Sequence, residues 1–473
     1  MDPVDVAAFV GFSEWFFLLY FTALNLLYLL LNLLSLISIR RYIPTKVLDD
    51  VAAVTTSLMP PVSILVPAYN EELTIASTVK SLLQQDYPEF EIVVINDGST
   101  DDTLDVLRRE LALVPFPEAY RINIPCKAVL QIYRSTLHPS IRVIDKINGG
   151  KADSLNAGIN GSRYPYFCSV DADTVLLKDS LRRVTAPFME DSGVVVSGGT
   201  VRVANGCQVL DGVLTRIGLP SNLLALFQVV EYLRAFLFGR VGWSAMNALL
   251  VISGAFGVFR KEVAVRVGGY RTDTLGEDME IIVRIHRILR RERVPYRVVF
   301  LPDPVCWTEV PETLGDLQGQ RTRWQQGLVE SLSKNWGLMF SRRGGLAGWV
   351  AFPCTLLFDW AGPFIEVFGY ILMVLFYLFG FINFGTFWLF MFVAFAVGLL
   401  LSLSGLFLEE ISFNTYSRPK YLLVLLLVAI LENLGYRQLN SLWRVLGVVR
   451  WIFRRKRRWG EMNRRATWVK AER

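Results

Sequence analysis

Residues 62–71 read VSILVPAYNE, and the change from mainly apolar to polar residues inside this stretch decides the fold. Its first part combines Val, Ile, Leu and Pro around a single Ser, which is the composition of a short strand buried on both faces. Three polar side chains, Tyr69, Asn70 and Glu71, follow at once. Because ligands of parallel sheets bind beyond the carboxyl ends of the strands, the stretch predicts a buried strand that ends at a ligand site.

The pattern of a buried run followed by polar residues recurs along the chain. Further runs rich in Val, Ile and aromatic residues stand at 91–95, 141–145 and 166–170, and each precedes a polar, helix-like segment. Alternating strand and helix patterns indicate an α/β domain with a mainly parallel sheet. Asp97 follows the second run, and Asp171 and Asp173 follow the fourth. We therefore expect these carboxylates at the same edge of the sheet as Tyr69.

Two common nucleotide-binding loops do not fit this sequence. A dinucleotide fold needs Gly-x-Gly-x-x-Gly after its first strand, where residues 67–70 read PAYN. Gly150 and Lys151 resemble the end of a phosphate loop. However, Asp145 stands in place of its first glycine and Ala152 in place of its Ser or Thr. Neither loop is therefore predicted.

Asp171 and Asp173 are candidate ligands for a metal ion. Two carboxylates on one edge of a turn repel each other unless a hard cation lies between them, and Mg²⁺ or Mn²⁺ with diphosphate oxygens meets that need. The pattern alone is weak, since background Asp usage gives about one Asp-x-Asp by chance in a chain of this length. A solvated loop is the alternative.

The sequence Gly276-Glu277-Asp278 begins a predicted helix over 278–292. A carboxylate at a helix start is often only a cap, but beside a metal-bound diphosphate Asp278 can accept a proton from an acceptor hydroxyl. The chain has only two histidines, His138 and His286, and we expect His286 at the surface of an Arg-rich helix. Acid–base chemistry therefore falls to carboxylates.

Residues 320–324 read QRTRW and form a second candidate site. Arg323 can donate two bonds to a phosphate, and Trp324 offers a flat face to a sugar ring. An ordinary amphipathic helix is the alternative, and 315–342 fits a helix that docks the domain on a membrane surface. A long helix around 208–240 and the run at 253–256 are expected to pack in the core, or else to shape an acceptor groove.

The composition indicates a chain that is partly embedded in a membrane. Of its 473 residues, 52% are hydrophobic and 13% aromatic, which exceeds ordinary globular usage. The net charge is +6, but the basic clusters flank apolar segments and no nucleic-acid-binding motif accompanies them, so we expect no nucleic-acid partner. The five cysteines lack metal-ligand spacing and are expected as reduced thiols.

An apolar run at 12–39 is long enough to cross a hydrocarbon core of about 30 Å. Acidic residues precede it, and Arg40 and Arg41 follow, which disfavours a cleaved signal peptide and places the next domain in the cytosol by the positive-inside rule. We expect an integral membrane protein of a bacterial inner or plasma membrane.

Apolar stretches return at 347–380, at 386–408 and from Tyr421. In the last one a polar stripe recurs with helical spacing; its residues are Asn433, Arg437, Asn440 and Arg444. Such a stripe faces a bundle interior, a polar conduit or the membrane surface, but not lipid. A basic cluster at 454–458 favours a cytosolic tail, so that either 347–380 is a hairpin or the last helix does not cross.

Six motifs occur together in one order: Pro67–Glu71, Asn96–Thr100, Gly150–Asp153, Asp171–Asp173, Gly276–Asp278 and Gln320–Trp324. Over residues 60–330 the set resembles the membrane-integrated, inverting family 2 glycosyltransferases, which include cellulose, hyaluronan, chitin and poly-N-acetylglucosamine synthases. The ordered set is far more specific than any single motif. The resemblance implies a GT-A fold, an α/β domain with a mainly parallel, Rossmann-like sheet, joined to transmembrane helices.

The resemblance also implies roles for individual residues. Those expected to bind the UDP-sugar donor are Tyr69, Glu71, Asp97, Lys151, Asp171 and Arg323, with Asp173 holding Mg²⁺ or Mn²⁺. Asp278 would be the catalytic base. The residues expected to hold the diphosphate and the acceptor end are Glu277, Gln320 and Trp324. Two features depart from the family: Gly276 stands where Thr is usual, which loosens that turn, and an insertion-like stretch occupies about 110–140.

The implied reaction is inverting transfer from UDP-N-acetylglucosamine or UDP-glucose onto a growing β-linked polysaccharide, coupled to export, with accessory export subunits as possible partners. One alternative is a single addition to a lipid acceptor. Another is a catalytically inactive membrane sensor or transport component, against which the intact aspartates argue.

The expected segments are a transmembrane helix at 1–45, the cytosolic GT-A domain at 60–312, the QRTRW segment with an interfacial helix at 313–345, transmembrane or interfacial helices at 346–449, and a cytosolic basic tail at 450–473.

Overall fold

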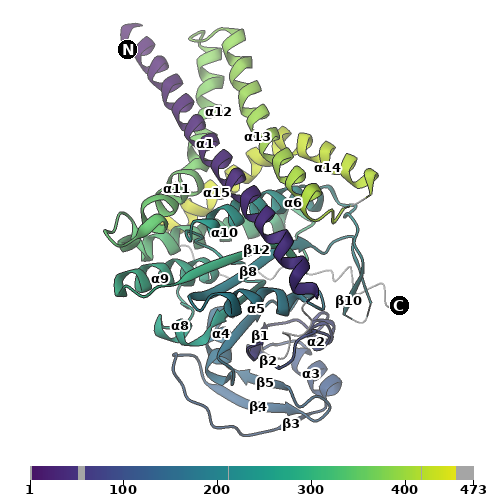
Figure 1. Ribbon diagram of the computed structural model, residues 1–473. Coiled ribbons are helices and arrows are strands. Elements are labelled where there is room, and N and C mark those ends of the chain that lie inside the picture. The colour runs from purple at the N-terminus through teal and green to yellow at the C-terminus, as the bar shows by residue number, and fades with distance from the viewer. Residues whose placement is uncertain (1–2, 52–58, 211, 417, 454–473) are drawn as a thin grey trace.

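The computed structural model describes residues 3–51, 59–210, 212–416 and 418–453, so most of the basic tail lies outside the described residues. Among them a ten-stranded sheet has the order β3-β4-β5-β2-β1-β6-β11-β8-β12-β7 (Figure 1). The four predicted strands are confirmed as β1 (Val62–Ala68), β2 (Phe90–Asn96), β5 (Ile141–Lys146) and β6 (Tyr166–Val170). They pair in parallel, as the alternating pattern predicts.

The other half of the sheet is mixed. Strand β11 (Phe256–Arg260) runs antiparallel between β6 and β8 (Val194–Val203), whose residues are all buried. Next to β8, β12 (Arg297–Thr308) runs parallel, and β7 (Thr174–Leu176) closes that edge in the antiparallel direction. The turn that carries Asp171 and Asp173 thus joins two strands of one sheet.

Helices follow the strands of the sheet. They are α2 (Ile75–Leu83), α3 (Thr103–Leu111), α4 (Lys151–Gly161), α5 (Ser180–Glu190), α8 (Lys261–Arg266) and α9 (Glu277–Glu292), the last as predicted. Helix α4 lies directly on the sheet because Gly158 has no side chain. A Cβ there would lie 3.0 Å from Ile95 and 3.2 Å from Leu65. This contact fixes the start of α4, where Lys151 lies.

The stretch at 110–140 widens the sheet at the end far from the long helices (Figure 1). It supplies β3 (Leu113–Pro115) and β4 (Val129–Ser135), which run antiparallel beside β5. In the intervening loop, Glu118 accepts bonds from Arg142 at 2.6 Å and from Arg163 at 2.8 Å. The insertion is therefore an ordered edge of the catalytic sheet.

The expectation of one long helix around 208–240 is wrong for its first part. Residues 208–216 form the hairpin β9 (Gln208–Leu210) and β10 (Val213–Arg216), and a helix starts only at α6 (Leu223–Leu233). It continues as the π-helix η2 (Arg234–Arg240) and α7 (Val241–Ala245). Gly206 and Gly212 have positive φ values of 85° and 76°, and a helix does not tolerate them.

Four of the described helical runs are long and apolar enough to cross a membrane: Ala8–Ile43, Ala347–Leu378, Phe384–Ser412 and Pro419–Ile452. The first lies in α1 (Pro3–Val51) and the third is α13 (Phe384–Ser412). The second joins η4 (Ala347–Ala351), α11 (Phe352–Cys354), η5 (Thr355–Trp360) and α12 (Gly362–Leu378). The fourth joins α14 (Pro419–Leu431), η6 (Glu432–Tyr436) and α15 (Arg437–Ile452).

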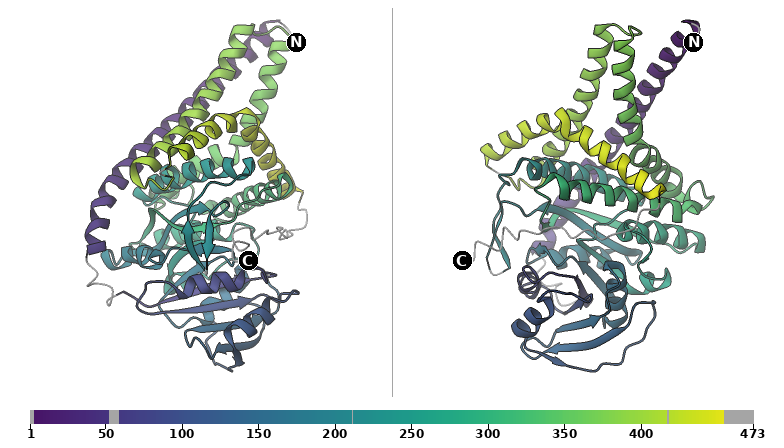
Figure 2. Two further views of the ribbon diagram at one scale, coloured as in Figure 1. Left: turned by 90° about the vertical axis from the view of Figure 1, so that its right-hand side faces the viewer. Right: turned by 180° about the vertical axis from the view of Figure 1, so that it is seen from behind.

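The long helices have two orientations. Helices α1, α12 and α13 rise together away from the sheet, whereas α14 and α15 lie across their base (Figure 2). The hairpin alternative for 347–380 is wrong, because residues 347–378 form one helical run with only a bend at Ala361, between η5 and α12. A kink at Leu434 and Gly435 separates α14 from α15.

Helix α10 (Leu314–Lys334) carries the QRTRW sequence and lies between the sheet domain and the long helices (Figure 1). Thr313 caps its start by accepting a bond from the Asp316 N–H at 3.2 Å. The helix packs against α9 on one side and α15 on the other. It therefore connects the start of α9, with its two carboxylates, to the helices of the membrane region.

Candidate active site

The loops after β1 and β2 are tied together at the carboxyl edge of the sheet. The Asn70 N–H donates to Ser99 Oγ at 3.1 Å, and Asn70 Oδ1 accepts from the Thr100 N–H at 2.9 Å. The Glu71 N–H donates to Thr103 Oγ1 at 2.8 Å. These bonds confirm that the polar ends of the two strands meet, as the sheet pattern predicts.

Tyr69 and Glu71 have different environments in this loop. The Tyr69 ring is 42% exposed at the edge of the sheet, where it can face a flat ligand. The Glu71 carboxylate is buried and accepts a bond from Thr74 Oγ1 at 2.8 Å. Glu71 thus stabilises the entry to α2, and Tyr69 is the more accessible of the two.

Asp97 holds the glycine loop that precedes α4. Its Oδ1 accepts from Lys146 Nζ at 2.5 Å and from the Gly149 N–H at 2.9 Å, and its Oδ2 accepts from the Gly150 N–H at 2.7 Å. Lys146 is completely buried and pairs also with Asp153 at 2.8 Å. Sequence reasoning missed Lys146, although a lysine ending a buried strand is a signal, because a buried ammonium requires carboxylate partners.

Lys151, the first residue of α4, lies among the acidic residues of the site. Its Nζ forms an ion pair with Asp171 and donates to the Gly254 carbonyl at 3.3 Å. Burial disfavours the charged ammonium, but Asp171, Glu277 and Asp278 outweigh that effect and raise the pKa of Lys151. The structure therefore brings three predicted carboxylates, Asp171, Glu277 and Asp278, together around the predicted cation, Lys151.

Gly254 lies between Lys151 and Asp278. A Cβ at Gly254 would lie 2.9 Å from Lys151 Nζ and 3.8 Å from Asp278 Oδ2. Ala255 and Phe256 of the run at 253–256 pack in the core as predicted, whereas Gly254 lies in the candidate site. Only a residue without a side chain leaves the ammonium and the carboxylate this close to one backbone.

Glu277 is buried beside the half-buried Asp278. Burial raises the pKa of Glu277 to about 7 against the opposing effect of the Lys151 ammonium, and the neighbouring Asp278 raises it further. The positive charge of Arg323 lowers the pKa of Glu277, as that of Lys151 does. The start of α9 therefore holds two carboxylates in different environments, which is how sites separate the protonation states of two acids.

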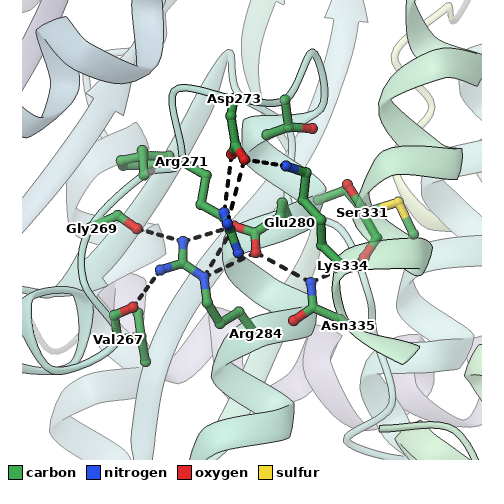
Figure 3. A network of polar contacts seen from close by, with 12 residues as sticks. Val267, Gly269, Arg271, Asp273, Glu280, Arg284, Ser331, Lys334 and Asn335 are labelled. Carbon is green, nitrogen blue, oxygen red and sulfur yellow. Dashed lines mark hydrogen bonds and ion pairs between the residues drawn. The ribbon is translucent and has the colours of Figure 1, made fainter. Parts of the chain in front are cut away.

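A polar network around Glu280 and Arg284 holds α9 in place (Figure 3). Glu280, fully buried, accepts from Arg284 Nη2 at 2.7 Å and from Asn335 Nδ2 at 3.2 Å. Arg284 also donates to the Val267 carbonyl and, at 2.6 Å, to the Gly269 carbonyl. The network ties α9 both to the loop before it and to the end of α10, so the start of α9 is held at both flanks.

The expectation that His286 lies at the surface is wrong. His286 is fully buried, with Nδ1 at 2.6 Å from the Tyr296 hydroxyl and Nε2 at 2.8 Å from the Leu249 carbonyl. Burial lowers the pKa of His286 to about 4, so the ring is neutral at pH 7. The arginines of α9 obscured this in the sequence, because the inward face of the helix is decided by its packing.

In the QRTRW sequence of α10, Gln320 and Arg321 are buried, whereas Trp324 is exposed. Arg321 pairs with Glu231 at 2.7 Å and lies 4.4 Å from the centre of the Trp324 ring, a role that the sequence did not reveal. Gln320 is buried, and its Oε1 has no hydrogen-bond partner among the described residues. Trp324 is 44% exposed, so it presents an aromatic face.

Trp324 lines a cavity of about 1070 Å³ that continues between the membrane helices. Met279, which follows Asp278, also lines the cavity. Further lining residues come from α1, η2, the 347–378 run, α13 and α15, and among the polar ones are Tyr28, Arg234, Glu366, Asn433, Arg437, Asn440 and Arg444. The polar stripe predicted on the last helix therefore faces a cavity inside the bundle.

Asp171 and Asp173 follow β6 at the same edge of the sheet, with Asp173 buried. No group of three or more metal-ligating side chains occurs among the residues that the structure describes. Mg²⁺ in transferases is commonly held by one or two carboxylates together with substrate phosphates. The two aspartates fit that mode, in which donor and protein share the ion.

The fold and the site define a glycosyltransferase with a GT-A domain and membrane helices. Residues 166–431 match the family described as glycosyl transferase family group 2, and residues 63–121 match glycosyl transferase family 2. The chain belongs to glycosyl transferase family group 2. The predictions of an α/β GT-A fold and of a family 2 hexosyltransferase are confirmed.

Among curated proteins, the chain is similar to poly-β-1,6-N-acetyl-D-glucosamine synthases. It is 30% identical to the one from Staphylococcus epidermidis over 275 residues, which is 58% of this chain and 56% of that protein. It is 31% identical to the one from Staphylococcus aureus strain COL over 277 residues, with the same coverage. The chain therefore spans about half the length of the curated relatives it matches.

Among solved structures, the chain is similar to a mannosyltransferase from Pyrobaculum calidifontis in complex with GDP-Man and Mn²⁺. The TM-score is 0.50 at 18% sequence identity, and the match covers 90% of this chain and 100% of that chain. A likeness at this identity concerns the fold alone, and it supports the GT-A fold.

Proposed function

We propose that this protein transfers a sugar, with inversion, from a UDP-sugar to the growing end of a β-linked polysaccharide. The observation that carries the proposal is the cavity of about 1070 Å³, which is lined by Trp324 and by Met279, the residue after Asp278, and by the helices that are apolar enough to cross a membrane. A cavity of this size, with Glu366, Asn433, Arg437, Asn440 and Arg444 among its lining residues, suits a chain of sugar rings. The similarity to poly-β-1,6-N-acetyl-D-glucosamine synthases supports UDP-N-acetylglucosamine as the first donor to test, with UDP-glucose as the second.

In this proposal the donor lies along the carboxyl edge of β1, β2 and β6. Tyr69 faces the uracil ring, while Glu71 and Asp97 shape the loops that hold the uridine. Lys151 and Arg323 contact the diphosphate, since cations bind phosphate oxygens strongly. When the donor enters, Lys151 exchanges part of its interaction with Asp171 for a phosphate oxygen.

Asp173, with Asp171, would hold Mg²⁺ or Mn²⁺ at the diphosphate. When bound, the ion neutralises the charge that develops on the UDP leaving group. The Mn²⁺ in the related mannosyltransferase structure supports this choice of ions. The protein's own part is to place the two carboxylates on the turn between β6 and β7, where they would hold the ion.

Asp278 accepts the proton from the acceptor hydroxyl as that oxygen attacks the anomeric carbon. Asp278 lies at the start of α9, next to Met279 of the cavity wall, which supports a position for its carboxylate between donor and acceptor. Glu277 and Gln320 lie behind it and support the diphosphate and acceptor side, and Trp324 stacks on the last sugar ring of the acceptor.

We place the catalytic domain in the cytosol of a bacterial inner or plasma membrane. Helices α1, α12 and α13 would cross the bilayer, and α14 and α15 would lie at its cytosolic surface, as their orientation in Figure 2 supports. With α12 leading out and α13 leading back, both the sheet domain and the tail after α15 are cytosolic. Accessory subunits would continue the export path beyond the bilayer.

A second function, the addition of one sugar to a lipid acceptor, is favoured by a different part of the cavity wall. Phe21, Leu24, Phe387 and Phe392 line it within the membrane region, where an acyl chain can lie. Product length separates the two functions. Purified protein in lipid nanodiscs is incubated with labelled UDP-N-acetylglucosamine or UDP-glucose, and the products are sized: a ladder of long, water-soluble glycans supports the polysaccharide, and only short, organic-soluble product supports the lipid acceptor.

A further inference from the structure

Arg240 ends the π-helix η2 and lines the cavity, and its charge lies close enough to Asp278 for the two groups to interact. Its guanidinium stacks 4.0 Å from the centre of the Phe236 ring and lies 5.8 Å from that of Phe300. Stacking on these rings fixes the plane of the guanidinium. Single π-helical turns inside α-helices are frequent at functional sites.

The hydrogen-bonding capacity of Arg240 is not used up by the protein. Nη1 of Arg240 is buried and has no hydrogen-bond partner among the described residues. Burial lowers the pKa of Arg240 to about 10 against the opposing effect of Asp278, so the side chain remains charged at pH 7. A buried charged donor without an acceptor is unfavourable until an oxygen binds to it.

Arg234, at the other end of η2, provides the contrast. It lines the same cavity, but its Nη1 donates to Glu432 at 2.7 Å and to Ser402 at 2.7 Å. The structure therefore satisfies one arginine of the π-helix with a carboxylate from η6 and leaves the other with spare donors beside Asp278.

We propose that Arg240 is a positioning residue for the acceptor, donating from its guanidinium to an oxygen of the terminal acceptor sugar and holding the attacking hydroxyl toward Asp278. This inference rests on the proposed function. Three observations carry it: the stacked guanidinium, its unpartnered donor, and its place in the cavity wall with Trp324 and Met279. Sugar hydroxyl and acyl oxygens are suitable acceptors for such a donor, and Asp278 then receives the proton of the oxygen that Arg240 orients.

The test separates acceptor binding from donor binding. Full-length wild type, R240Q and R240K in nanodiscs are supplied with UDP-N-acetylglucosamine and increasing concentrations of a β-1,6-linked N-acetylglucosamine oligosaccharide, and both transfer and UDP release are measured. We expect R240Q to raise the KM for the oligosaccharide about tenfold or more, to increase UDP release relative to transfer, and to leave UDP affinity and thermal stability unchanged. R240K, which keeps the charge without the planar fork, should give an intermediate KM.

Arg260 offers a matched control, since its guanidinium lies 6.0 Å from the centre of the Tyr166 ring, outside the cavity. R260Q should keep the wild-type KM for the oligosaccharide. The inference is overturned if R240Q and R240K elongate with the wild-type KM. It is also overturned if both lose UDP affinity or thermal stability in parallel with transfer, because Arg240 then binds the donor or supports the fold. A wild-type protein that transfers no sugar from either UDP-sugar refutes the proposed function itself.

Discussion

Gly276 and Gly327 meet backbone to backbone. A Cβ on Gly276 would lie 2.8 Å from Cα of Gly327, and a Cβ on Gly327 would lie 2.7 Å from Cα of Gly276. The Ser331 hydroxyl lies between the two glycines, 2.7 Å from the Gly327 carbonyl oxygen and 3.2 Å from that of Gly276, so that its one proton can be donated to either, and Glu330 accepts a bond from the Leu275 N–H at 2.8 Å. The glycine that replaces the usual threonine is therefore explained: it lets α10 approach the turn that carries Glu277 and Asp278.

A side chain at this contact should displace the catalytic turn. We expect G276T and G327A each to lower the free energy of unfolding by about 1–3 kcal/mol, as overpacking does, and to reduce transfer at least tenfold. Gly319 is the matched control on α10, because a Cβ there meets nothing within 4 Å. G319A should raise stability by about 0.5–1 kcal/mol and keep full activity. Thermal unfolding and transfer assays of the three variants measure these effects, and an active, stable G276T would contradict the packing argument.

Lys146 should be required for donor binding although it is remote from the sugar. K146M leaves the carboxylates of Asp97 and Asp153 buried without their cation, which should destabilise the protein by about 3–5 kcal/mol and loosen the loop at 149–150. UDP affinity should fall accordingly in a titration. Lys80 is the control, because its pair with Glu110 is exposed, and K80M should change stability by less than about 1 kcal/mol. Equal UDP affinity in K146M and wild type would refute this role.

His286 should make the protein sensitive to acid. Since its pKa is lowered to about 4 in the folded state, the unfolded chain binds more protons between about pH 6.5 and pH 4. The stabilising contribution of the neutral ring is complete above this window and is lost as the pH falls through it, by up to about 3 kcal/mol. Unfolding measured from pH 7 to pH 4.5 should show a steeper loss in wild type than in H286Q. H138Q, at an exposed position, should follow wild type; identical curves for all three would exclude His286 as the cause.

Removal of divalent metal should stop transfer. Because no group of three or more metal-ligating side chains occurs among the described residues, the ion should bind weakly without a nucleotide and tightly with one. We expect a chelator to abolish activity, Mg²⁺ or Mn²⁺ to restore it, and D173N to require at least tenfold more metal. Isothermal titration of Mn²⁺ with and without UDP measures the dependence directly. Full activity after chelation would contradict the assignment of Asp173.

Much of this fold was predictable from local pattern. The runs that became β1, β2, β5 and β6 are rich in Val, Ile and aromatic residues and lead into polar residues at their carboxyl ends, so both strand and site edge follow from the residues themselves. The gathering of Lys151, Asp171 and Asp278 followed from that edge together with the family resemblance.

The features that the sequence did not reveal depend on distant partners. The Gly276 contact needs Gly327, Arg321 needs Glu231 from α6, and neither pairing has a local signal. His286 is buried because Tyr296 and Leu249 surround it, while arginines dominate its own helix. The hairpin at 208–216 depends on Gly206 and Gly212, and a pattern of apolar residues does not predict their positive φ values.

The most direct test of the account is the D278N variant in full-length protein, with D105N on the exposed surface of α3 as the matched control. UDP binding and sugar transfer are measured side by side with the same UDP-sugar. If Asp278 is the base, D278N binds UDP with nearly wild-type affinity while transfer falls by about a thousandfold or more, and D105N is unaffected. Sugar transfer by D278N at a rate close to that of wild type would contradict the proposal.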